Sequence, residues 1–161
     1  MKFRTEPKIS DIESIRKVVE SSGFFHDYEV DTAVELVEEF LDSGEESGYK
    51  FVFLDDENDS LLAFSCFGEI ACTWKRYDIY WIAVTDEQRG KGLGKFVLQE
   101  TEKQIAAIGG IIAYLETSSK DLYLPTRTFY EKSGYLKETV IKDFYEDGDS
   151  KVIYSKRLRQ I

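Results

Sequence analysis

A short segment rich in glycine and basic residues, 89–95, has the residue types of a phosphate-binding loop. It follows an apolar run at residues 79–84 and a polar turn at 85–88, and apolar residues recur at helical spacing after it. Glycines allow consecutive backbone N–H groups to point into one concavity, and the start of a helix adds a partial positive charge. We therefore predict a socket for a phosphate or a pyrophosphate at this segment.

Two common nucleotide-binding patterns do not fit this loop. The P-loop has four residues between its first glycine and its Gly-Lys pair, whereas three residues separate Gly90 from Gly94, and Phe96 replaces the required hydroxyl. The dinucleotide fingerprint G-x-G-x-x-G would need a glycine where Lys95 stands. A glycine-rich connection without any ligand is the remaining alternative.

The pattern that fits is R-x-x-G-x-G, formed by Arg89, Gly92 and Gly94 directly after the hydrophobic run. This arrangement resembles the acyl-CoA pyrophosphate loop of the GNAT superfamily of N-acetyltransferases. The resemblance implies acetyl-CoA as co-substrate, with Lys91 and Lys95 helping to neutralise its pyrophosphate. On the alternative reading, both lysines are solvated loop charges.

A second segment resembles the other GNAT signature, in which phenylalanine and tyrosine are followed by three residues, a glycine and an aromatic residue. Here these positions are Phe129, Tyr130, Gly134 and Tyr135. The resemblance implies that Tyr130 reaches the cofactor sulfur and protonates the departing thiolate as general acid. The alternative is that Tyr130 packs in the core, as we expect of Phe129.

A carboxylate near the start of the central strand is the candidate base. Asp78 matches the position of the family's frequent glutamate base, and by strand alternation it shares a face with Tyr80, Ile82 and Val84. An ordinary aspartate, with a pKa of ~3.9, is a poor direct base, so Asp78 would need burial or a water relay. A solvated carboxylate or a ligand for the substrate's ammonium is equally compatible with the sequence, and Glu69 and Tyr80 are lesser candidates.

The resemblance also implies which residues contact the cofactor and the acceptor. The end of the central strand would hydrogen-bond the pantetheine arm as an added strand, and its amide could stabilise an oxyanion. The predicted cofactor-binding residues are Ile82, Ala83, Val84, Arg89, Gly90, Lys91, Gly92, Leu93, Gly94, Lys95, Thr126 and Phe129. Phe24, Phe25 and Tyr80 are predicted to bind substrate, although a Phe-Phe pair is more often found in a core.

Elements that position these residues can be predicted along the whole chain. Strands are expected at residues 1–6, 49–54, 61–67, 79–84, 111–116, 135–144 and 151–158. Helices are expected at 11–20, from Asp31 (or Glu29) through Leu41, at 92–108 and from Pro125 through Lys132. This order is what the resemblance predicts: an α/β (α+β) GNAT fold with a mixed sheet of about six to seven strands, about four helices and one domain over residues 1–161.

Composition bounds the remaining possibilities. The 161 residues carry a net charge of −10, which argues against binding to nucleic acid or to an anionic membrane. Cys66 and Cys72 fit two reduced thiols beside a turn, and the single histidine, His26, lies too far away in sequence to complete a metal site, so no metal is expected. The N-terminus has no apolar leader, so we expect a cytoplasmic protein.

Together these observations predict an N-acetyltransferase that moves an acetyl group to a primary amine of a small molecule or peptide by direct attack. Neither cysteine lies in a pattern that would activate it, so no covalent intermediate is expected. A non-catalytic acyl-CoA-binding module with the same fold is the alternative. The closing strands could pair two copies into a homodimer.

Overall fold

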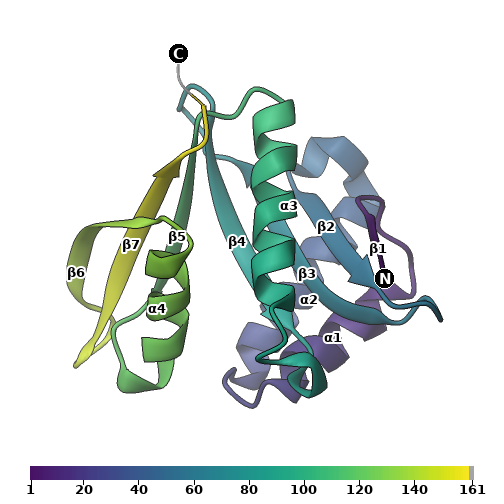
Figure 1. Ribbon diagram of the computed structural model, residues 1–161, viewed down its shortest axis with the longest axis horizontal. Coiled ribbons are helices and arrows are strands. Elements are labelled where there is room, and N and C mark those ends of the chain that lie inside the picture. The colour runs from purple at the N-terminus through teal and green to yellow at the C-terminus, as the bar shows by residue number, and fades with distance from the viewer. Residues whose placement is uncertain (160–161) are drawn as a thin grey trace. The chain divides into compact units, whose positions relative to one another are not determined.

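The computed structural model describes residues 1–159, and it forms one mixed sheet with the strand order β1-β2-β3-β4-β5-β7-β6 (Figure 1). The strands are β1 (Lys2–Arg4), β2 (Lys50–Asp55), β3 (Leu61–Glu69), β4 (Arg76–Val84), β5 (Ile112–Ser118), β6 (Leu136–Glu146) and β7 (Asp149–Arg157). The α-helices are α1 (Asp11–Ser21), α2 (Asp27–Ser43), α3 (Leu93–Ala107) and α4 (Leu124–Lys132). The predicted fold class is confirmed.

The chain divides into two compact units, and β4 contributes to both of them. Unit 1 comprises Met1–Glu69 and Ile79–Gln104, and unit 2 comprises Ile70–Asp78 and Ile105–Ile161. The expectation of a single domain over residues 1–161 stays a prediction. Within residues 1–159, no helix combines the length and the apolar character needed to cross a membrane.

In unit 1, helices cover both faces of the sheet. Figure 1 shows α1 and α2 behind β2 and β3, with α3 in front. The apolar stripes of α1 and α2, including Ile15, Val19 and Val37, pack against Phe51 and Phe64 of the strands. Burial of such side chains is worth about 1.5–3 kcal/mol each, so this interface supplies much of the unit's stability.

A polar contact joins α3 to the sheet. The hydroxyls of Ser65 on β3 and Thr101 on α3 lie 2.6 Å apart, and both residues are fully buried. Thr101 Oγ1 also donates to the carbonyl of Val97 at 2.7 Å. Because a hydroxyl has one proton, Ser65 must be the donor in the contact with Thr101.

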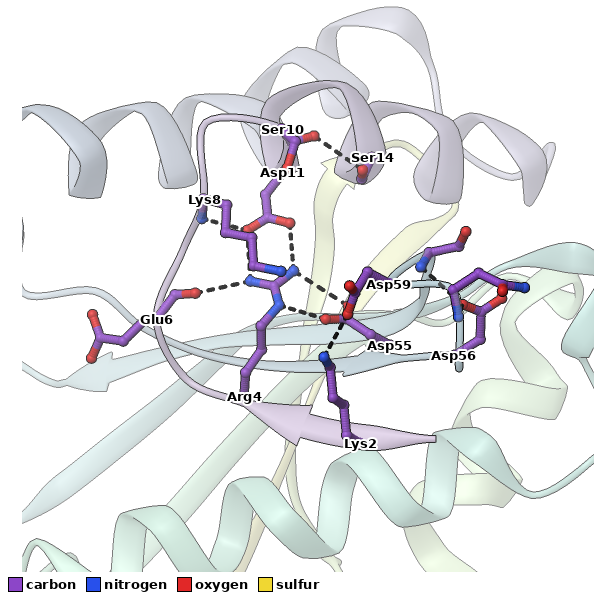
Figure 2. A network of polar contacts seen from close by, with 12 residues as sticks. Lys2, Arg4, Glu6, Lys8, Ser10, Asp11, Ser14, Asp55, Asp56 and Asp59 are labelled. Atoms are coloured by element: carbon purple, nitrogen blue, oxygen red, sulfur yellow. Dashed lines mark hydrogen bonds and ion pairs between the residues drawn. The ribbon is translucent and has the colours of Figure 1, made fainter.

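A buried charge network ties the first strand to the unit 1 core (Figure 2). Arg4 Nε donates to Asp55 Oδ2 at 2.6 Å, and its two terminal nitrogens donate to the carboxylate of Asp11 at 2.8 and 2.6 Å. The same guanidinium lies 4.1 Å from the centre of the Phe53 ring. One arginine therefore satisfies two carboxylates that are almost fully buried.

In unit 2, the start of β4 pairs in parallel with β5, and β7 lies antiparallel between β5 and β6. α4 packs on this sheet through Tyr130, whose ring centre lies 5.8 Å from that of Tyr154 on β7. All residues of β6 are exposed, among them Leu136 and Phe144, as expected for a strand at the edge of the sheet.

Several predicted element boundaries were wrong, among them those of α2, β4 and β1. α2 begins at Asp27, before the expected Glu29 or Asp31, because His26 occupies the N-cap of the helix. The backbone N–H of His26 donates to the Glu29 carboxylate at 2.8 Å. β4 begins at Arg76 instead of residue 79, since parallel pairing with β5 extends it toward the N-terminus. β1 covers only Lys2–Arg4.

Several burial expectations were also wrong. The run at residues 79–84 is not covered on both faces, because Tyr80 is 41% exposed while Ile79 and Ala83 are buried. On α3, Val97 is fully buried but Phe96 is 54% exposed, so only part of the apolar pattern faces the core. Cys66, inside the predicted strand at 61–67, is buried within β3, and Cys72 is exposed.

Candidate active site

The predicted site residues are divided between the two units. Unit 1 holds Phe24, Phe25, Tyr80, Ile82, Ala83, Val84 and residues 89–95, whereas unit 2 holds Asp78, Thr126, Phe129 and Tyr130. Residues 1–159 contain no group of three or more His, Cys, Asp or Glu side chains arranged to hold a metal ion.

The glycine loop connects the 3-10 helix η2 (Asp86–Gln88) to α3. Gly90 and Gly92 both have positive φ angles, +72° and +82°, which L side chains rarely adopt. Apart from the adjacent residues of the chain, a Cβ built at either position meets no atom of residues 1–159 within 4 Å, so the surface above both glycines is open. In the first turn of α3, Leu-Gly-Lys-Phe, the N–H of Phe96 donates to the Gly92 carbonyl at 3.2 Å, and the backbone N–H groups of the preceding residues lie at this end of the helix.

Basic side chains surround the loop in different ways. Arg89 lies with its guanidinium 4.3 Å from the centre of the Phe24 ring, and its Nη1 is 3.5 Å from Asp86 Oδ1. Lys91 Nζ folds back onto η2, where it donates to the Glu87 carbonyl at 3.0 Å. Lys95 is exposed on the first turn of α3. In this state Arg89 is held beside the loop, and Lys91 is turned toward η2.

The end of β4 leads directly into this loop. Ala83 is buried, whereas Ile82 and Val84 are partly exposed, as alternation along a strand requires. Backbone pairing with β3 continues just beyond the strand, where the N–H of Thr85 donates to the Leu62 carbonyl at 2.9 Å. The predicted pantetheine-binding backbone and the glycine loop therefore belong to one continuous segment of unit 1.

The three predicted substrate-binding aromatics have different surroundings. Phe25 packs against Trp81, with ring centres 5.1 Å apart, at the margin of the unit 1 core. Phe24 contacts Arg89, as described above. Tyr80 is the most exposed of the three and meets Tyr49 edge-on, with ring centres 5.6 Å apart.

Tyr80 depends on a glycine of the neighbouring strand. A Cβ built at Gly68 would lie 3.0 Å from Tyr80 Cε2 and 2.5 Å from the Gly48 carbonyl oxygen. Any side chain at this position would therefore displace the Tyr80 ring or the backbone at Gly48.

Tyr130 lies near the end of α4 and is only 5% exposed. Its ring is surrounded by Phe129, Tyr135 and Tyr154, with ring centres 5.7 to 6.3 Å away. Burial, and secondarily the neighbouring tyrosines Tyr154 and Tyr145, raise the pKa of Tyr130 well above its ordinary value. The phenol therefore keeps its proton at neutral pH, which is the state that a general acid requires.

α4 is fastened at its first turn by a residue that sequence analysis missed. Arg127 Nη1 donates to the carbonyls of Ser118 and Lys120 at 2.7 and 2.9 Å. The Ser118 hydroxyl in turn donates to the Asp149 carboxylate at the start of β7. Nothing in the spacing of Arg127 indicated this role, because its partners are backbone atoms of the preceding loop.

Asp78 is the third residue of β4, opposite Tyr114 of β5, and it is partly buried. Desolvation raises its pKa above the ordinary value of 3.8, and the nearby Glu116 carboxylate raises it further, while Lys151 acts in the opposite direction. Lys151 and Glu116 form an ion pair of 2.7 Å. Burial thus shifts Asp78 in the direction that a base requires.

This shift predicts a pH-dependent effect of the Asp78→Asn change. Because the pKa is raised on folding, the stability that this group contributes is fully present below 3.8 and is lost as the pH rises through the raised pKa. Asparagine has no proton to lose, so the variant should gain stability relative to the parent between pH 4 and pH 7. Melting temperatures of both proteins across this range test the expectation, and a constant difference would contradict it.

With this geometry established, comparison with known proteins gives the family. Residues 47–137 match the acetyltransferase (GNAT) domain model. The chain belongs to the GNAT acetyltransferase family. A GNAT-family protein from Desulfovibrio desulfuricans is 40% identical, covering 98% of this chain and 99% of that one, with a TM-score of 0.96. The search of curated protein sequences returned no match.

Two more distant solved structures share the GNAT fold. An aminoglycoside 6'-N-acetyltransferase complexed with coenzyme A is 19% identical, covers 100% of this chain and 99% of its own, and has a TM-score of 0.77. The ribosomal-protein-S18-alanine N-acetyltransferase from Escherichia coli is 16% identical, covers 99% and 95%, and has a TM-score of 0.77. The present chain is an acetyltransferase by family, and GNAT proteins use acetyl-CoA.

Proposed function

We propose that this GNAT protein transfers the acetyl group of acetyl-CoA directly to a primary amine of a small molecule or peptide. The observation that carries the proposal is the open loop at Gly90 and Gly92, which leads into the N-terminus of α3 directly after β4. Backbone N–H groups of such a loop bind a diphosphate without a specific side chain. Arg89, Gly90, Lys91, Gly92, Leu93, Gly94 and Lys95 would hold the diphosphate, and Ile82, Ala83 and Val84 the pantetheine arm.

The proposed reaction needs one acid and one base. The amine nitrogen attacks the thioester carbon, the C–S bond breaks, and the departing thiolate takes a proton from Tyr130. The proton lost by the amine passes to Asp78, directly or through water. With a cysteine thiol (~8.5) standing in for the coenzyme thiol, proton transfer from an ordinary tyrosine (~10) is uphill by about 2 kcal/mol. Burial of Tyr130 increases this cost unless the thiol is desolvated as well.

The identity of the base limits the acceptor. Deprotonating a lysine-type amine (pKa ~10.4) at pH 7 costs about 4.6 kcal/mol, whereas an α-amine (~7.7) costs about 1 kcal/mol. A partly buried aspartate is better matched to the second class. The amines modified by the two distant structural neighbours, an aminoglycoside and a protein alanine, illustrate a small-molecule and a polypeptide acceptor.

A non-catalytic acyl-CoA-binding module remains the second candidate, because the burial of Tyr130 favours it. Only 5% of the Tyr130 residue is exposed, so its phenol must become accessible before it can touch a thiolate. A homodimer through β6 is a further proposal, supported by the exposed Leu136, Val140 and Phe144 side chains on that edge strand.

Coenzyme A binding provides the first test. Coenzyme A at about 100 times its dissociation constant should stabilise the protein by about 2.7 kcal/mol, whereas ATP and NAD should not. Gly92→Val places a β-branched side chain at a φ of +82° in the open surface of the loop, so it should abolish this stabilisation. Melting temperatures with each ligand give the result, and Gly148→Val, at a φ of +84° in the β6–β7 turn, is the matched control.

Thiol release from acetyl-CoA with a panel of amines then distinguishes the two candidates. An enzyme releases coenzyme A in proportion to the acceptor supplied, and a binding module does not.

If Gly92→Val and the parent respond equally to coenzyme A in the melting-temperature test, the loop is not the diphosphate site.

A further inference from the structure

We propose that Phe24 is a positioning residue for Arg89, and that the segment joining α1 to α2 thereby sets the affinity for acyl-CoA. This proposal rests on the function proposed above. It gives Phe24 a different role from the substrate binding that the sequence predicts.

Two contacts join this segment to the start of the glycine loop, and all of their residues belong to unit 1. The Arg89 guanidinium lies 4.3 Å from the centre of the Phe24 ring. The backbone N–H of Asp86 donates to the hydroxyl of Ser21 at 3.1 Å. Ser21 at the end of α1 therefore contacts Asp86, and Phe24, three positions further along the chain, contacts Arg89.

Phe24 itself has a defined backbone position. Its N–H donates to the hydroxyl of Ser22 at 3.2 Å, and that hydroxyl donates to the Val19 carbonyl in the last turn of α1. The aromatic ring is thus presented from a short turn attached to a helix whose apolar side is buried in the unit 1 core. A ring held in this way can fix a flexible side chain that packs on it.

Stacking on an aromatic ring suits an arginine that must also bind an anion. A guanidinium has five N–H donors in its plane, and an aromatic ring on its face uses none of them. The ion pair with Asp86 occupies only Nη1, at 3.5 Å, and the Asp86 side chain is well exposed. Arg89 is therefore held in a restricted orientation while most of its donors stay available for diphosphate oxygens, which it can contact in a bidentate manner.

Preorganisation explains why this matters for affinity. An arginine next to flexible glycines would lose its side-chain freedom on binding the cofactor, and that loss would weaken binding. Packing on Phe24 reduces the freedom of Arg89 before the cofactor arrives. If Phe24 instead contacts the acceptor amine, its replacement should raise the KM for the acceptor and leave coenzyme A affinity unchanged.

Calorimetric titration with coenzyme A tests the proposal. We expect Phe24→Leu, which keeps an apolar side chain but removes the ring, to weaken coenzyme A binding by about two- to fivefold, as an exposed cation–π contact predicts. Phe24→Trp should restore or exceed the parent affinity, because tryptophan is the best partner for a cation. In an Arg89→Ala background, Phe24→Leu should cause no further loss.

The outcomes separate this proposal from the proposed function. A parent protein that binds no coenzyme A contradicts the function itself. Normal binding by both the parent and Phe24→Leu, or an equal loss with and without Arg89, overturns only the role of Phe24. If Phe24→Leu does not fold, Phe24→Trp decides alone, since an affinity below that of the parent would contradict the proposal. KM values for acetyl-CoA and for the amine provide a second readout, and only the former should rise in Phe24→Leu.

Discussion

Replacing Tyr130 by phenylalanine should lower the turnover of acetyl-CoA at least about tenfold while coenzyme A binding persists. The change removes only the phenolic hydroxyl from a ring that packs against Tyr154 and Tyr135, so the aromatic cluster should stay intact. Without a proton donor the thiolate must leave as an anion, and a tenfold loss corresponds to about 1.4 kcal/mol of transition-state stabilisation. Thiol release under saturating acetyl-CoA measures the effect.

Tyr135→Phe is the matched control for this experiment. It makes the same chemical change in the same aromatic cluster, 6.3 Å from the Tyr130 ring, at a residue that is just as buried. Turnover by this variant should stay near that of the parent. Equal turnover in Tyr130→Phe and the parent would remove Tyr130 from the mechanism, and another group would have to protonate the thiolate.

The largest expected effect on stability comes from Arg4→Ala. Its removal leaves the carboxylates of Asp11 and Asp55 buried without their cation (Figure 2). Breaking a buried ion pair by deleting one partner typically costs about 3–5 kcal/mol. Urea unfolding should therefore show a markedly lower midpoint, and the fraction of protein that is folded at 37 °C should fall.

Lys2→Ala is the corresponding control, since it breaks an ion pair on the same strand. Lys2 Nζ lies 2.5 Å from Asp59, but both side chains are 60% exposed. Water and salt screen such a pair, so its loss should leave the unfolding midpoint almost unchanged. Similar midpoints for Arg4→Ala and the parent would show that the buried network is no stronger than the surface pair.

Local features of the chain could be predicted from the sequence, because their causes are local. Gly90 and Gly92 adopt the positive φ angles that a glycine loop implies, and α3 begins at Leu93. Helix α2 was placed too late because sequence signals for an N-cap are serine, threonine, asparagine and aspartate. His26 takes that position instead, with the Glu29 side chain bonded to its backbone N–H.

Properties that depend on distant partners could not be predicted. Arg76 and Tyr77 belong to β4 because they pair in parallel with Ile112 and Ala113 of β5. No local sequence pattern indicates this pairing. The raised pKa of Asp78 also depends on the folded chain, since it comes first from burial and then from the Glu116 carboxylate on another strand. Phe24 was assigned to the acceptor from its position in the family, and its contact with Arg89 appears only once α1 and the loop are folded together.

The hydrogen bond between Ser65 and Thr101 restricts movement of α3 along the sheet. A helix that packs on a sheet by apolar contacts alone can shift along the sheet at small cost, because the hydrophobic effect is not directional. Sliding by one turn, about 5.4 Å, would leave the Ser65 hydroxyl without its partner in a dry interface, at about 1–3 kcal/mol, whereas Thr101 would keep its bond to the Val97 carbonyl within the helix. The position of the first turn of α3 along the strands is thereby fixed by Thr101, which lies two turns further along the helix and outside the glycine loop.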